Sequence, residues 1–376
     1  MFVVRVPDLT VLRVLGDAIS QTCYAYFMND THSRKTRLLA LKSIGNVLAT
    51  KKTSEAMTTL AQIVATHAQG LENLSGATEN EEMLEQYSFK IAIFSALFAS
   101  LAERDRTRLV TESESTIVQI IREAMPVLER IHEMIGPAGG PLVNDLADAL
   151  QSAMMSLPDA YVQHIFAFVF RFLSSALLTN TMSACRLAKG VVLICGKNFD
   201  ETTFTAIGSW FAMAEANVAG PPLEELLALM YQIIKKEWKA LRAYEERSLA
   251  LVRSSINVSA YVILNYQDPN VVRTASQLLA TIANNTTHND DRPARDLIAS
   301  YGGDLVKTVF QKLQRETIRQ TVDSLAEVLF FFCQQQVLNT EENGNSPMVA
   351  AMFREIGNLR NFKKMTLRFN LESVKV

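Results

Sequence analysis

Apolar residues recur at spacings of three and four along nearly the whole chain, which is the period of an amphipathic helix. Segment 267–285 shows the pattern clearly, with apolar positions Val271, Val272, Ala275, Leu278, Leu279 and Ile282. Asp268 can accept hydrogen bonds from the free N–H groups of a helix start, and Pro269 fits a first turn, where no donor is needed. Asn284 and Asn285 are expected to end this helix.

Similar segments follow one another with short connections and predict roughly fifteen helices of ~15–22 residues. The only stretch that resembles a strand is Phe-Val-Val-Arg-Val, residues 2–6. The predicted helices occupy residues 32–50, 53–74, 79–103, 113–135, 142–156, 180–197, 200–217, 220–241, 248–266 and 267–285, with others after Pro158 and Pro293 and a last one from Ser346 to about Phe369.

Paired into hairpins, these helices give seven or eight units, near the ~40–47 residues per unit of helical solenoids. A single compact core stops growing at about 250–300 residues, and this chain has 376. We therefore expect an all-α fold, a HEAT-like helical-hairpin solenoid (α-α superhelix), over residues 1–338. A polar loop at 339–346 and a terminal capping helix and tail at 347–376 are expected to follow.

The prolines support this organisation. Five stand where helices are predicted to start, whereas Pro126 lies inside a helix and should kink it. A kinked first helix, an Asp-containing turn and a Val-Arg second helix are typical of HEAT repeats. Residues 268–283 resemble the second half of such a repeat, and residues 33–49 do so more loosely, with Arg37 in the place of its arginine. The five prolines at helix starts are Pro158, Pro222, Pro269, Pro293 and Pro347.

Composition narrows the class of protein. Hydrophobic residues make up 48% and charged residues 20%, which argues against disorder along most of the length. The net charge of -2 gives no global sign of nucleic-acid binding, and 15 glycines and 10 prolines are few for an all-β protein. Four widely spaced cysteines, read as buried free thiols, indicate a reducing compartment. They are Cys23, Cys185, Cys195 and Cys333.

Neither a membrane span nor a secretory signal is expected. The most apolar stretch, residues 161–178, contains His164 and Arg171, and charged residues interrupt the apolar amino-terminal segment. We therefore expect a soluble intracellular protein.

No catalytic, cofactor-binding or metal-binding residues emerge, and no phosphate loop or hydrolase motif is present. The His-Asn-Asp-Asp stretch at 288–291 is interpreted as a solvated loop rather than a metal site, and residues 136–140 and 301–305 as glycine turns. Carboxylate pairs such as Glu224 and Glu225 are read as helix-start charge. Two tryptophans and several methionines are assigned to packing: Trp210, Trp238, Met154, Met155, Met213 and Met230.

The carboxyl end is basic. Its cations are interpreted as the solvated face of a capping helix, the alternative being a patch for nucleic acid or an acidic partner. They are Arg354, Arg360, Lys363, Lys364 and Arg368.

Two stretches resemble importin-β-type nuclear transport receptors (karyopherins), and within them the transportin-SR and importin-thirteen branch. Residues 36–74 are similar to a repeat of that branch in which an Arg-Leu helix with a late glycine, here Gly45, precedes a second helix. Residues 352–370 resemble the basic and aromatic helix that closes such receptors. The resemblance implies that the chain corresponds to the carboxyl-terminal half or so of a receptor.

The resemblance also implies a function: a monomeric, non-enzymatic carrier in cytoplasm and nucleus that binds protein cargo without a cofactor. The Ran GTPase is a possible partner, although the amino-terminal repeats that bind it in the family have no counterpart here. Partner-binding residues stay unknown, and membrane or nucleic-acid partners are not expected. The alternatives are a generic HEAT-repeat scaffold of a multiprotein complex and a helical enzyme with a cryptic site.

Overall fold

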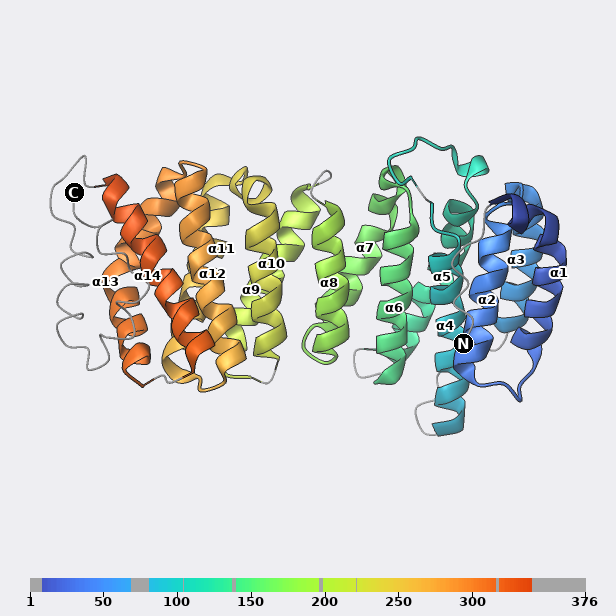
Figure 1. The fold of residues 1–376 in the computed structure, drawn as a ribbon, viewed down its shortest axis with the longest axis horizontal. Coiled ribbons are helices and arrows are strands. Elements are labelled where there is room, and N and C mark those ends of the chain that lie inside the picture. The colour runs from blue at the N-terminus through green and yellow to red at the C-terminus, as the bar shows by residue number, and fades with distance from the viewer. Residues whose placement is uncertain are drawn as a thin grey trace. The chain divides into compact units, whose positions relative to one another are not determined.

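The computed structural model describes residues 9–68, 81–103, 105–136, 140–195, 199–220, 222–315 and 318–339 (Figure 1). Within these ranges the chain is all-helical and contains no strand, which confirms the predicted all-α, HEAT-like helical-hairpin fold. The α-helices are α1 (Leu9–Met28), α2 (Arg34–Leu48), α3 (Thr53–Ala68), α4 (Glu81–Ser100), α5 (Thr116–Ile135), α6 (Pro141–Ser156), α7 (Asp159–Ala176), α8 (Thr181–Cys195), α9 (Glu201–Ala216), α10 (Leu223–Arg242), α11 (Glu245–Asn265), α12 (Pro269–His288), α13 (Arg292–Arg315) and α14 (Arg319–Asn339). A 3-10 turn, η2 (Glu112–Glu114), precedes α5.

The chain divides into two compact units, residues 1–194 and 195–376. In the first unit, α2, α4 and α6 pack side by side, and α3, α5 and α7 form a second row. Large apolar side chains fill the space between helices, because each helix has one wide apolar face to bury. Fully buried examples are Leu41, Leu60, Phe98, Leu128, Leu150 and Phe172.

The second unit repeats this arrangement. One row consists of α9, α11 and α13, and the other of α10, α12 and α14 (Figure 1). Consecutive helices from the two rows pack as hairpins, so each hairpin contacts the next through both rows. Side chains buried between the rows include Ile207, Trp210, Leu227, Ile234, Leu278 and Phe310.

Most predicted helix starts are confirmed. Pro158 and Pro222 stand immediately before α7 and α10, and Pro269 is the first residue of α12. Pro293 is the second residue of α13. Helix α5 continues through Pro126.

Two predicted helix breaks are wrong. Helix α12 runs through Asn284 and Asn285 to His288, because Thr286 is fully buried and Asn285 bonds to the neighbouring α10, so tertiary contacts extend the helix. Residues 301–305 lie in the middle of α13 rather than in a glycine turn. Burial of Ile298, Leu305 and other apolar residues of α13 outweighs the roughly 1 kcal/mol that each glycine costs a helix.

The packing predictions mostly hold. Trp210 and Trp238 are buried, as are Met154 and Met230, but Met155 is 45% exposed and does not fill the core. Its position, one residue beyond a buried methionine, turns it away from the apolar face of α6. Cys185 is buried as predicted, whereas Cys23 is only partly buried.

Several predictions lie outside the described residues. They concern the strand at 2–6, the side chains of Cys195 and Cys333, Pro347, the loop beyond residue 339 and the basic capping helix at 347–376. No helix of the described part combines the length and apolar character needed to cross a bilayer.

Candidate protein-binding face

The titratable side chains of the described residues do not converge on one centre. No group of three or more His, Cys, Asp or Glu residues in these ranges could hold a metal ion. Burial raises the pKa of Asp145 and of Glu237, and it lowers the pKa of His132, but these residues belong to α6, α10 and α5. The polar groups instead join neighbouring helical hairpins.

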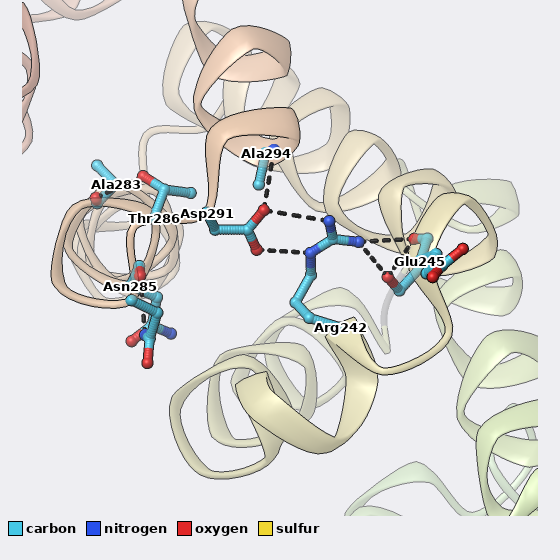
Figure 2. Close-up of polar contacts among 9 residues, drawn as sticks. Arg242, Glu245, Ala283, Asn285, Thr286, Asp291 and Ala294 are labelled. Atoms are coloured by element: carbon cyan, nitrogen blue, oxygen red, sulfur yellow. Dashed lines mark hydrogen bonds and ion pairs between the residues drawn. The ribbon is translucent and has the colours of Figure 1, made fainter. Parts of the chain in front are cut away.

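A shielded junction joins Arg242, at the end of α10, to Asp291, just before α13 (Figure 2). Nε of Arg242 donates to Oδ2 of Asp291 at 2.6 Å, and Nη2 donates to Oδ1 at 3.1 Å. The two side chains are 13% and 10% exposed, so this is a shielded, two-pronged pair. Nη1 of Arg242 also donates to the Glu245 carbonyl at 2.6 Å and to Oγ of Ser248 at 2.5 Å.

Asp291 completes the junction by accepting a hydrogen bond from the backbone N–H of Ala294 at 3.2 Å. One ion pair therefore fixes the end of α10, the start of α11 and the start of α13. The interpretation of residues 288–291 as a solvated loop is wrong for Asp291, because Arg242 shields it. Asp290 is 77% exposed and pairs with Arg295.

A second polar network joins α2, α4 and α6 in the first unit. Arg34 donates to the Ser88 hydroxyl at 2.6 Å and to the Ser88 carbonyl at 3.0 Å, and it pairs with Asp145 at 3.2 Å. Ser88 in turn donates to Asp145. Burial raises the pKa of the Asp145 carboxyl, while the bonds from Ser88 and the charge of Arg34 act against that rise.

The two arginines that suggested HEAT repeats make different contacts. Arg37 donates to the Phe27 carbonyl at 2.8 Å and pairs with Asp30 at 2.7 Å, so it holds the turn between α1 and α2. Arg273 is half-buried and reaches Gln320 of α14 at 3.5 Å. Asp268 caps α12 as predicted, accepting from the N–H of Asn270 at 2.8 Å.

Helix α10 is kinked at Glu237, whose backbone angles (φ -110°, ψ 20°) are not helical. Asn285 of α12 donates from Nδ2 to the carbonyl of Ile234 at 2.9 Å, one turn before the kink. Glu237 is 7% exposed, and burial raises its pKa against the opposing charge of Lys236. The kink and the bond from Asn285 together hold the second half of α10 against α12.

Lysines mark the solvent side of this kinked segment. Lys235, Lys236 and Lys239 are exposed, and none of them forms an ion pair within the part of the chain that the structure describes. Nζ of Lys235 lies 3.0 Å from the hydroxyl of Tyr231 and 5.2 Å from its ring centre. Neighbouring α12 contains no Asp or Glu at any position. The second half of α10 and the adjacent α12 therefore expose lysines and no carboxylate, and we call this stretch the basic surface.

Sequence reasoning missed both the junction and the basic surface. Nothing in a single sequence connects Arg242 with Asp291, which are 49 positions apart. The apolar stripe of residues 220–241 does leave the lysines outside, so their exposure could have been predicted. Their position beside the carboxylate-free helix α12 depends on the packing of two separate hairpins.

Comparison with known proteins agrees with this architecture. Residues 264–339, which contain α12, α13 and α14, match a family model described as the Importin 13 repeat. The fold is similar to that of importin 13. A solved structure of importin 13 in its cytosolic state matches with a TM-score of 0.73 and 16% sequence identity, covering 95% of this chain. The chain spans 40% of the length of that importin 13 chain.

The remaining comparisons add little. A solved engineered protein matches with 13% identity over 94% of this chain and 92% of its own, but its TM-score of 0.34 is too low to carry an argument. No curated protein sequence matches the chain. At 16% identity the likeness to importin 13 shows the fold, and the repeat match points in the same direction.

Proposed function

We propose that this chain is part of a karyopherin-type nuclear transport receptor of the transportin-SR and importin-thirteen branch, which binds protein cargo on its helical repeats. The observation that carries the proposal is the Importin 13 repeat match at residues 264–339, inside a fold that matches importin 13 over 95% of the chain. The protein would act by binding alone, and would work as a monomer in cytoplasm and nucleus.

The architecture supports such a role in physical terms. Each helical hairpin packs against its neighbours through both rows of helices, and polar junctions such as Arg242–Asp291 link successive hairpins. Small rotations at successive junctions add up along a repeat protein, so a binding partner can change the curvature of the stack at low energetic cost. A GTPase such as Ran, acting on the complete receptor, could then release cargo by favouring one curvature.

Binding of defined partners tests the proposal. The purified chain is immobilised and offered an arginine–serine-rich protein, a lysine-rich basic protein and GTP-loaded Ran, with GDP-loaded Ran as the matched control. We expect retention of at least one cargo, and any Ran binding should be restricted to the GTP form. Retention of none of these proteins would refute the carrier role, and cargo retention that equals capture by an unrelated HEAT-repeat protein would favour a general scaffold.

Localisation gives a second readout. A fluorescent fusion of the chain is expected in both cytoplasm and nucleus. Strict exclusion from the nucleus would contradict the proposed function.

A further inference from the structure

A long connection in the first unit touches the starts of several helices. Residues 101–115 join α4 to α5, whereas residues 49–52 are enough to join α2 to α3, and residues 157–158 to join α6 to α7. Long connections are uncommon in compact folds, and those that are ordered usually have a role of their own. We call residues 105–115 the strap.

The strap is held in position by hydrogen bonds rather than by apolar burial. Every residue from 105 to 114 is exposed or partly exposed, and Leu109 is 89% exposed. A segment with so few buried side chains ordinarily opens at little energetic cost. Its polar attachments to the neighbouring helices therefore decide how it behaves.

Two of these attachments join the strap to the first turn of α7. The carbonyl of Arg106 accepts a hydrogen bond from the N–H of Asp159 at 2.9 Å, and the carbonyl of Val110 accepts one from the hydroxyl of Tyr161 at 3.0 Å. The Arg106 guanidinium also pairs with the Asp159 carboxylate at 3.3 Å. The N–H of Asp159 is thus a direct reporter of strap opening.

The other end of the strap is attached to α3. The carbonyl of Glu114 accepts a hydrogen bond at 2.9 Å from Oγ1 of Thr53, the first residue of α3. Helix α5 starts directly after the strap and packs against both α3 and α7. The strap therefore links the starts of the two helices that flank α5 in its row.

The segment between these attachments forms a closed turn. The N–H of Thr111 donates to Oε2 of Glu114 at 3.0 Å, and the N–H of Glu114 donates to the carbonyl of Thr111 at 3.0 Å, so that η2 is held from both ends. This turn fixes the separation of Val110 from Glu114. Movement at one attachment is therefore transmitted to the other.

We propose that the strap couples the start of α3 to the start of α7, so that the hairpins on the two sides of α5 rotate together. A partner that changes the curvature of the first unit must then either move both hairpins or release the strap. The coupling is a property of the fold, and its test is independent of the proposed carrier role.

Hydrogen exchange of the full chain, followed by mass spectrometry, tests this coupling. Thr53→Val removes the donor to Glu114 while keeping the shape of the side chain, so the start of α3 should exchange about two- to tenfold faster. The deciding readout is the first turn of α7, where exchange should rise about twofold or more. Tyr161→Phe, which removes the donor to Val110, should reciprocally speed exchange at the start of α3.

Thr58→Val is the matched control on α3. The Thr58 hydroxyl is exposed and donates to the carbonyl of Ser54 within the same helix at 3.0 Å, so its loss should leave exchange in α7 unchanged. An equal increase in α7 for Thr53→Val and Thr58→Val would reveal general loosening of α3 and overturn the proposal. The same conclusion follows if Thr53→Val speeds exchange only in α3 and the strap.

Two insertions separate the strap from the helix packing around it. Gly-Ser-Gly between Val110 and Thr111 lengthens the segment between the two attachments and should abolish the effect of Thr53→Val on α7. The same insertion between Arg108 and Leu109 lies outside that segment and should preserve the effect. If the effect survives both insertions, the coupling runs through α5 and the strap does not carry it. Far-UV circular dichroism confirms that each variant is folded.

Discussion

Replacing Gly45 by alanine should destabilise the first unit, because α2 crosses α4 at this residue. A Cβ atom at position 45 would lie 1.9 Å from Oγ of Ser100 and 2.7 Å from its Cβ. Rotation of the Ser100 side chain can remove the first clash. The second involves an atom held by the backbone, so the two helices must move apart.

The expected loss of stability in Gly45→Ala follows from two opposing effects. Overpacking a tight helix contact costs about 1–3 kcal/mol, and a contact this short places the cost towards the upper end. Alanine in place of glycine stabilises a helix by about 0.5–1 kcal/mol. The net loss should therefore be about 1–2 kcal/mol. Gly303 of α13 is the matched control, since a Cβ there meets nothing within 4 Å, and Gly303→Ala should stabilise by about 0.5–1 kcal/mol.

Hydrogen exchange followed by mass spectrometry measures both effects locally, which suits a chain of two units in which a single unfolding transition is not guaranteed. Peptides from α2 and α4 should exchange faster in Gly45→Ala, whereas peptides from α13 should exchange more slowly in Gly303→Ala. Adding Ser100→Gly to Gly45→Ala should restore much of the lost protection. The reasoning fails if Gly45→Ala exchanges as slowly as the unmodified chain.

Three further variants concern the second unit. Arg242→Met removes the ion-pair partner of the shielded Asp291 and should destabilise the second unit by about 3–5 kcal/mol, seen as faster hydrogen exchange in α10, α11 and α13. Unchanged exchange in these helices would contradict the role of Arg242 as a junction. Burial raises the pKa of Glu237, so this side chain contributes fully to the stability of the folded unit below its unfolded-state pKa and loses that contribution as the pH rises through its folded-state pKa. Glu237→Gln, which resembles the protonated form, should therefore stabilise the unit at neutral pH and leave its stability unchanged in acid. Identical pH profiles of stability for the two proteins would refute this. Asn285→Ala removes one hydrogen bond to the Ile234 carbonyl and should cost about 0.5–1.5 kcal/mol and speed hydrogen exchange in α10; unaltered exchange there would count against it.

The helices themselves could be read from the sequence because their signals are local. The caps and prolines at Asp268, Pro269 and Pro158 depend on a few neighbouring residues, and the structure places helix starts there. The errors arose where packing overrides local preference. Asn285 would usually end a helix, yet its bond to Ile234 keeps it inside α12.

The basic surface was predictable from the sequence only in part. Periodicity alone places Lys235 and Lys239 on the polar side of their helix. It cannot show that the adjacent helix lacks carboxylates, because adjacency in the fold joins residues about 50 positions apart. The same limit applies to Asp291. Its local sequence indicates a solvent-exposed position, whereas its partner Arg242 comes from the previous hairpin.

The same contacts that shape the basic surface also join the hairpins. Asn285 sets the level of α12 against α10, and the kink at Glu237 lies between Lys235 and Lys239 on the second half of α10. The helix then ends at Arg242, in the ion pair that positions α11 and α13. A rotation at this junction would therefore alter the spacing between the lysines and α12.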